Sequence, residues 1–215
     1  MLENGNNQTP GILAIFNNAA PGREAEFEEW FQTEHLLERI AVPGFLLGRR
    51  YEALSGALRY FNYYLTQSVD ILKSKAYLAR LDNPTPMTRV VMSEIFKDMN
   101  RTVCRCVFRL GAMRGAAAVA VRFGEKPNHD VLKAKVEALV QKSAVACGEI
   151  WIAADRFDFP VSEEERLRGG DRKIEACLLI ETLRVSDAED IAQHLTESFP
   201  RAAICAYRLL CEVRP

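Results

Sequence analysis

The chain has 215 residues, 48% of them hydrophobic and 27% charged, and 28 Lys and Arg against 29 Asp and Glu give a formal net charge of -1. This composition is typical of a globular protein with a hydrophobic core, in one large domain or in two of about 100 residues. The near-zero charge argues against nucleic acid and against an anionic membrane surface as partners.

The first ten residues are polar and rich in Asn, without the basic and apolar regions of a secretory signal, so we expect a cytoplasmic protein. The longest apolar runs are far shorter than the ~20 residues of a membrane-spanning helix. The six cysteines lie in apolar segments, and none forms the CxxC pair of a structural zinc site. We therefore expect reduced, buried thiols and no metal site. The cysteines are Cys104, Cys106, Cys147, Cys177, Cys205 and Cys211.

The first half of the chain predicts the element order β-α-β-β-α-β. Two helices are expected, over residues 23–42 and 69–81, and a short extra helix is expected within 84–100. The second and third strands form a hairpin around Ser55-Gly56. The predicted strands cover residues 11–17, 44–54, 58–67 and 102–111.

The second half predicts the same order. Apolar positions with helical spacing indicate a helix over about 130–144, and Ser186 with Glu189 has the capping-box spacing that opens another helix before Pro200. A charged loop over 160–172 contains the run Glu163-Glu164-Glu165, which we expect to be solvated. The predicted strands cover residues 116–124, 148–157, 173–183 and 202–213.

The repeated order predicts an α+β fold of two tandem ferredoxin-like βαββαβ repeats, over residues 1–114 and 115–215. Helices cover one face of such a sheet, so the other face must be solvated or packed. We expect the two antiparallel sheets to face each other within the chain and to form an α/β barrel. Its half-polar interior would be a natural cavity for a small molecule.

Alternating residues on two strands suggest which side chains face that interior. We assign the amphipathic set of each strand to the interior and the other set to the helix-covered core. Arg105 and Arg109 would suit a carboxylate or enolate, although they could instead extend to the barrel rim or pair with Glu52 or Glu34. The interior sets are Tyr60, Asn62, Tyr64 and Thr66, and Val103, Arg105, Val107 and Arg109; the core sets are Phe61, Tyr63 and Leu65, and Cys104, Cys106, Phe108 and Leu110.

Glu34 interrupts the apolar face of the first predicted helix. Either the helix breaks near this residue and turns Glu34 toward a partner, or Glu34 is buried against a cation such as an arginine. The adjacent His35 is either a structural histidine or a general acid/base, because imidazole titrates near neutral pH. We expect His129 and His194 on the surface.

The motif WxxTEHLxERxAVPGF, which begins at Trp30 and is followed by RRY, resembles EthD-like members of the dimeric α/β-barrel superfamily. The later PTPMTR and RTVCR are similar to segments of uncharacterised proteobacterial relatives. The resemblance implies that the second half supplies the sheet that a second chain supplies in other members. It singles out Glu34, His35, Arg50, Tyr51 and Tyr64. The second half has neither TEH nor PGF, so we expect one site per chain.

The superfamily includes cofactor-independent monooxygenases, lactone isomerases, polyketide cyclases and haem enzymes. The resemblance therefore implies a cofactor-independent enzyme that acts in the barrel cavity on a small hydrophobic or aromatic acid or ketone, by proton abstraction, isomerisation or oxygenation. We expect His35 and Glu34 to be catalytic. The expected substrate-binding residues are Tyr51, Tyr60, Asn62, Tyr64, Arg105 and Arg109.

Two other functions stay open: a non-catalytic barrel protein that binds a small ligand or haem, and an assembly element without an active site. No sequence feature supports haem binding. The sequence leaves open whether the chain forms a homodimer. The chain contains no GxGxxG, Walker A, GxSxG or HExxH motif, so nucleotide-dependent chemistry, serine hydrolysis and zincin-type catalysis have no support.

Overall fold

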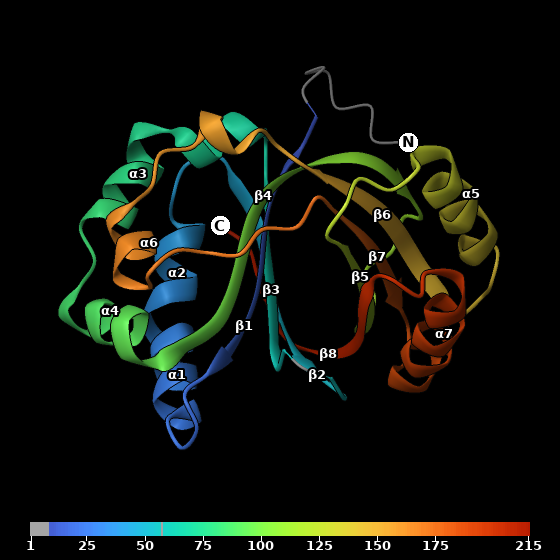
Figure 1. The fold of residues 1–215 in the computed structure, drawn as a ribbon, viewed down its shortest axis with the longest axis horizontal. Coiled ribbons are helices and arrows are strands. Elements are labelled where there is room, and N and C mark those ends of the chain that lie inside the picture. The colour runs from blue at the N-terminus through green and yellow to red at the C-terminus, as the bar shows by residue number, and fades with distance from the viewer. Residues whose placement is uncertain (1–8, 57) are drawn as a thin grey trace.

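The computed structural model describes residues 9–56 and 58–215. Most of the polar N-terminal segment, in which we expected no targeting signal, lies outside the described residues. Within them, eight antiparallel strands close into a barrel in the order β1-β3-β2-β8-β5-β7-β6-β4 (Figure 1). The strands are β1 (Gly11–Ala19), β2 (Phe45–Ala53), β3 (Tyr60–Thr66), β4 (Phe96–Leu110), β5 (Ala117–Phe123), β6 (Val145–Ala153), β7 (Ala176–Thr182) and β8 (Ala203–Val213).

The barrel consists of two sheets with the same internal order, β4-β1-β3-β2 and β8-β5-β7-β6. Pairing of β2 with β8 and of β4 with β6 joins them at both edges. Helices lie outside the barrel, with α1 to α4 over the first sheet and α5 and α7 over the second. The prediction of two ferredoxin-like units that form an intrachain barrel is confirmed.

The helical elements include two π-helical turns and short 3-10 turns. Among the described residues, no helix is both long enough and apolar enough to cross a bilayer. The helical elements are α1 (Glu24–Trp30), η1 (Phe31–His35), α2 (Leu36–Ile40), η2 (Val69–Lys73), α3 (Lys75–Asp82), α4 (Pro86–Val90), η3 (Val91–Ile95), α5 (His129–Val140), η4 (Arg156–Asp158), α6 (Glu163–Leu167) and α7 (Val185–Ser198).

Closely packed aromatic rings fill the barrel interior. The ring centroids of Phe16 and Phe61 are 4.5 Å apart, and those of Tyr63 and Trp151 are 5.1 Å apart. Ala118 on β5 belongs to the same buried cluster, where its small side chain leaves room for the rings. An eight-stranded barrel can be filled by side chains or can hold one small ligand, and here buried side chains fill it. The expected small-molecule cavity inside the barrel is therefore wrong.

The assignment of faces on β3 is also wrong. Phe61 and Tyr63 point into the barrel, whereas Tyr60 and Tyr64 belong to the core under α1 and α2. The period of two separates the two sets correctly, but both sets are aromatic, so the pattern alone does not say which set faces inward.

A β-bulge changes the alternation on β4. Cys104 belongs to the buried cluster of the barrel interior, and Cys106 packs against it. The register of β4 with β6 shifts between Cys106 and Phe108. Phe108 therefore packs against the core under α5 and α7, and Arg109 approaches the buried Glu149 at 3.6 Å. A bulge adds one residue and so exchanges the two faces beyond it.

The run Glu163-Glu164-Glu165 is not a solvated loop. These residues begin α6, which belongs to the second half of the chain but packs against α3 and η3 of the first (Figure 1). Glu164 is 3% exposed. A segment between β6 and β7 thus completes the helical layer over the first sheet.

The six cysteines all lie among the described residues and are free thiols, as predicted. Four of them are buried, and Cys106 and Cys211 are partly buried. Burial raises the pKa of Cys177 to about 12, which keeps this thiol protonated near neutral pH.

The link between the two halves predicts a strong effect at Gly115. A Cβ atom there would lie 2.3 Å from the Thr182 carbonyl oxygen, while the Gly115 N–H donates to Glu181 at 2.8 Å. We expect Gly115→Ala to lower the free energy of unfolding by about 2 kcal/mol through overpacking. Gly124→Ala, whose Cβ would meet nothing within 4 Å, is the control. Urea denaturation measures both, and equal stabilities would contradict the prediction.

Candidate functional site

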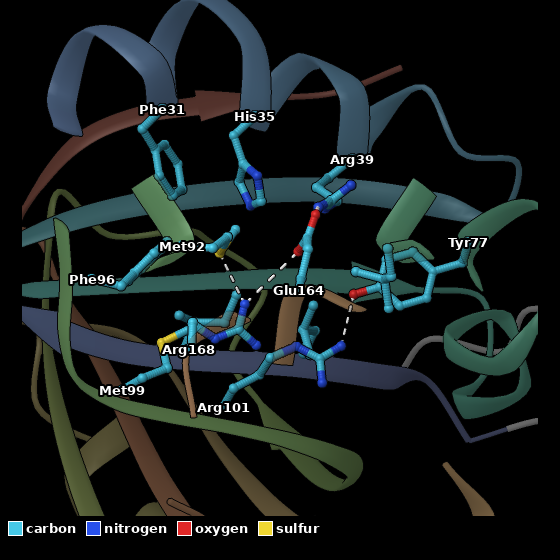
Figure 2. A pocket seen from close by; sticks show the side chains of 13 residues that line it. Phe31, His35, Arg39, Tyr77, Met92, Phe96, Met99, Arg101, Glu164 and Arg168 are labelled. Carbon is cyan, nitrogen blue, oxygen red and sulfur yellow. Dashed lines mark hydrogen bonds and ion pairs between the residues drawn. The ribbon is translucent and has the colours of Figure 1, made fainter. Parts of the chain in front are cut away.

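A small pocket lies between the first sheet and its helical layer (Figure 2). Its volume of about 10 Å³, counted for the centre of a water molecule, is room for about one water. Strands β1 and β4 form its floor, and η1, α2, α3, η3 and α6 surround it. Its polar lining consists of His35, Arg39, Tyr77, Arg101, Glu164 and Arg168, and its apolar lining includes Phe31, Met92, Phe96 and Met99.

His35 enters this pocket from the π-helical turn η1, which lies between α1 and α2. Such turns insert one residue into a helix and occur frequently at functional sites. The imidazole is 4% exposed and lies 4.4 Å from the Trp30 ring and 5.2 Å from the Phe31 ring, between centroids. Its Nδ1 has no hydrogen-bond partner in the described part of the chain.

Burial lowers the pKa of His35 well below 6.5, and the positive charges of Arg39, Arg168, Arg101 and Arg50 lower it further. The imidazole is therefore neutral near pH 7. A neutral imidazole keeps one nitrogen lone pair, so His35 can accept a proton.

Arginines give the pocket a positive character. Arg39 forms a buried ion pair with Glu164 of α6, but its Nη1 has no partner among residues 9–56 and 58–215. Arg168 binds both carboxylate oxygens of Asp171, at 2.8 and 2.7 Å, and Arg101 donates to the Tyr77 hydroxyl at 2.9 Å. These three cations face two carboxylates, which leaves an excess of one positive charge.

Glu34 points away from the pocket. Its Oε1 accepts hydrogen bonds from the hydroxyls of Thr85 at 2.5 Å and Thr88 at 2.7 Å, and from the indole N–H of Trp30 at 3.2 Å. Thr85 caps the N-terminus of α4. Of the two alternatives that the sequence left open, the structure shows the first, in which the helix turns Glu34 toward a partner. Glu34 thereby ties η1 to the start of α4.

Three further predicted residues lie on β3 beneath the same helix, beside the pocket. Tyr60 donates its hydroxyl to Glu28 at 2.9 Å. The side-chain amide of Asn62 and the hydroxyl of Tyr64 are buried and find no partner in the described chain. Tyr60 and Tyr64 share the core under the helices with Trp30 and Phe31, whose rings lie against His35, but none of the three predicted residues lines the pocket. Arg105 is exposed on the outside of β4 and does not join them.

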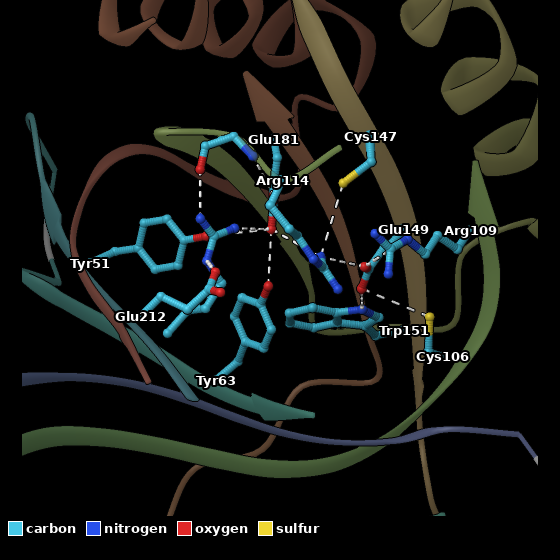
Figure 3. A network of polar contacts seen from close by, with 12 residues as sticks. Tyr51, Tyr63, Cys106, Arg109, Arg114, Cys147, Glu149, Trp151, Glu181 and Glu212 are labelled. Atoms are coloured by element: carbon cyan, nitrogen blue, oxygen red, sulfur yellow. Dashed lines mark hydrogen bonds and ion pairs between the residues drawn. The ribbon is translucent and has the colours of Figure 1, made fainter. Parts of the chain in front are cut away.

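Tyr51 and Arg109 belong to a different cluster, inside the barrel (Figure 3). Glu181 accepts from Tyr63 at 2.9 Å and from Gly115 N–H, pairs with Arg49 at 2.7 Å, and lies 3.4 Å from the Tyr51 hydroxyl. Burial alone would raise the pKa of Glu181, but Arg114 and Arg49 outweigh it and hold that pKa below its usual value.

Arg114 connects Glu181 to a second buried carboxylate. It lies 3.1 Å from Glu181 and 2.7 Å from Glu149, which also accepts the indole N–H of Trp151 at 2.7 Å. Both carboxylates therefore have several donors. Such a satisfied network holds the barrel together and leaves little capacity for a ligand.

Sequence reasoning missed five polar residues of the pocket, among them Tyr77 on the second predicted helix. Arg39 had a signal, because it follows His35 by four residues and so lies on the same helical face. Arg101 lies just before the predicted strand 102–111, whereas β4 begins at Phe96. Glu164 and Arg168 had no signal, because only the tertiary structure brings α6 over the first sheet.

The depressed pKa of His35 predicts a specific titration. NMR of the three histidine rings should show that the His35 signals do not shift as the pH falls through 6.5. The unfolded chain binds a proton near that pH and the folded chain does not, so stability should decline below about pH 6.5. His35→Gln should remove part of this decline. A His35 ring that titrates at 6.5 would contradict the prediction.

The contacts of Glu34 predict a structural cost. Glu34→Ala removes a charged acceptor from three donors and should lower the free energy of unfolding by about 2 kcal/mol. Glu29→Ala, at an exposed position of the same helix, should change it by less than about 0.5 kcal/mol. Urea denaturation followed by tryptophan fluorescence measures both, and equal effects would argue against an anchoring role.

No protein-family model and no curated protein sequence matches the chain. Several solved structures resemble it. An "anthrone oxidase-like protein" has a TM-score of 0.60 at 10% identity, over 97% of this chain and 94% of that one. A "putative monooxygenase" from Fusobacterium nucleatum has a TM-score of 0.58 at 10% identity, over 97% and 95%. A haem-binding protein from Thermus thermophilus has 0.50 at 12% identity, over 95% and 92%. The chain has the dimeric α/β-barrel fold, with both ferredoxin-like units in one polypeptide.

Proposed function

We propose that the chain is an enzyme that binds a small acid with an aromatic or apolar body in the helix-covered pocket. His35 then accepts a proton from a carbon next to a carbonyl group of this ligand. One observation carries the proposal: a buried, neutral imidazole with an unpartnered Nδ1 lines a pocket that has surplus positive charge.

Two atoms without hydrogen-bond partners in the described chain, Nδ1 of His35 and Nη1 of Arg39, have complementary roles. The proton passes from the carbon to the His35 imidazole, and the electron pair moves to the carbonyl oxygen, which becomes an enolate oxygen. Arg39 lies one helical turn from His35, and its Nη1 can donate to that oxygen. The enolate leads to isomerisation when the proton returns at another atom, or to oxygenation when it reacts with dioxygen.

The influence of the pocket's arginines on the pKa of His35 changes when an acid binds. In the empty pocket they lower the pKa of His35 and weaken it as a base. The carboxylate of a bound acid offsets their charge and makes proton uptake by His35 easier. The pocket thus favours proton transfer when an anion is present.

Ligand entry requires the pocket to enlarge, since it holds about one water. Helix α6 is the element to move, because it is short and comes from the other half of the chain. It covers the pocket through the ion pair of Glu164 with Arg39 and through the contact of Arg168, which follows α6, with Met92 of η3 at 3.0 Å.

Haem binding is the alternative that the sequence left open, and His35 is the one histidine in the pocket. The surroundings of His35 do not favour a haem, because the Trp30 and Phe31 rings lie against the imidazole, with centroids 4.4 and 5.2 Å from it. Small-molecule chemistry agrees with the names of two structural neighbours, a monooxygenase and an anthrone oxidase-like protein.

Phenylpyruvate tests the proposal, because it combines an aromatic ring, a carboxylate and an acidic carbon beside a ketone. In D₂O, the protein should accelerate exchange of its benzylic protons, measured by proton NMR. His35→Gln should reduce this rate by roughly 10²- to 10⁴-fold, the usual contribution of a positioned base. The control is His194→Gln, at an exposed position of α7, which should leave the rate unchanged.

Circular dichroism should show that both variants are folded. Wild-type protein without any acceleration, or a folded His35→Gln variant with the full rate, would overturn the proposal. A Soret band that depends on His35 after haem is added would favour the alternative.

A further inference from the structure

Arg50 on β2 is a buried cation without a polar partner. Its side chain is 0% exposed, and Nε, Nη1 and Nη2 all find no hydrogen-bond partner among the described residues. Its guanidinium carbon lies 4.5 Å from the centroid of the Phe31 ring and 5.5 Å from that of Tyr60. Aromatic faces attract a cation, but they do not replace the five hydrogen bonds that a guanidinium can donate.

No nearby carboxylate compensates this charge. Glu28 acts on Arg50 electrostatically, but it accepts the Tyr60 hydroxyl at 2.9 Å and lies 3.8 Å from Arg59. Arg39 adds further positive charge to the same side of the sheet. Burial lowers the pKa of Arg50 and outweighs the opposite effect of Glu28.

Two more unpartnered polar side chains lie beside Arg50. Asn62 is its register partner on β3, 1% exposed, with neither side-chain atom bonded within the described chain. Tyr64, two residues along the same face and also 1% exposed, has an unpartnered hydroxyl. Buried polar groups in folded proteins are nearly always hydrogen-bonded. Three such side chains on one face therefore indicate a missing partner, and an acceptor is required because a guanidinium only donates.

This group of residues adjoins the pocket of His35. The Phe31 ring centroid lies 4.5 Å from the Arg50 guanidinium carbon and 5.2 Å from the centroid of the His35 imidazole, so both groups contact the same ring. An arginine binds a carboxylate through two parallel hydrogen bonds, and the Asn62 amide and Tyr64 hydroxyl can donate further ones.

We propose that Arg50, Asn62 and Tyr64 form a carboxylate subsite beneath η1, which holds the acid group of the ligand while His35 faces its reacting carbon. The subsite deepens the proposed function and rests on it. It also accounts for the energetic cost of the unpaired cation, since the charge is compensated only when the ligand is bound.

Phenylacetate and the neutral phenylacetamide test the subsite, because they differ in charge and hardly in shape. Calorimetry should show that the wild-type protein binds phenylacetate at least ~10-fold more tightly, as expected for hydrogen bonds to a charged group. Arg50→Met should abolish this preference by weakening phenylacetate binding alone. Without ligand, Arg50→Met should raise Tm by about 2 to 4 °C, because it removes an unpaired buried charge. A purely structural arginine would give a lower Tm instead.

The matched control is Arg122→Met. Arg122 is partly buried, and its guanidinium carbon also lies over an aromatic ring, 4.8 Å from the Phe16 centroid, but it lies in the barrel away from the pocket. This variant should keep the preference for phenylacetate. If Arg50→Met does not fold, Arg50→Lys and Asn62→Leu take its place, and each should reduce the preference.

A wild-type protein without a preference for phenylacetate, or folded Arg50 and Asn62 variants that keep it, would overturn the subsite. Proton exchange on phenylpyruvate separates this outcome from failure of the proposed function. If the protein accelerates proton exchange through His35 but does not prefer phenylacetate to phenylacetamide, the proposed function is retained and the subsite is rejected. If the subsite exists, Arg50→Met should raise KM for the exchange far more than it lowers kcat.

Discussion

The closure of the barrel by two strand pairs, β2 with β8 and β4 with β6, is the constraint on which the rest of the structure depends. These pairs satisfy the backbone groups at both edges of each sheet, so neither sheet keeps a free edge in the described chain. They also bring the two inner faces so close that stacked rings fill the space between them. The pocket that contains His35 lies on the outer face of the first sheet, under helices.

The two outer faces differ sharply. The core under α5 and α7 consists of aliphatic and aromatic side chains packed between two helices and the second sheet. The core under α1 and α2 contains an imidazole and several buried arginines among its aromatic rings. The second half of the chain nevertheless takes part in the polar side, because α6 crosses over and contributes Glu164 and Arg168.

The buried polar groups fall into two classes with different physical consequences. In the barrel, Glu149 and Glu181 have several donors each, and such a network stabilises one arrangement. Beneath η1, the guanidinium of Arg50 and the amide of Asn62 have no partners in the described residues. Unpaired buried groups destabilise the empty protein, and proteins keep such local costs mainly at functional sites.

By itself, the sequence determined the order of the elements, their repetition and the two alternating sets of residues on β3. These features follow from local periodicity, which depends only on residues that are close in sequence. The sequence also grouped Tyr60, Asn62 and Tyr64 on one face, and it singled out His35 at the break in its helix. These residues do lie together beside the pocket.

Only the tertiary structure decided which face points into the barrel, because both sets on β3 are aromatic and either could be buried. It also decided the bulge after Cys106, which turns Arg109 inward, and the partners of Glu34, which are hydroxyl groups 51 and 54 residues away in sequence. The position of Glu164 depends on a contact with Arg39 across 125 residues. Local patterns carry no information about such pairings, since they arise only when the two sheets and their helices pack together.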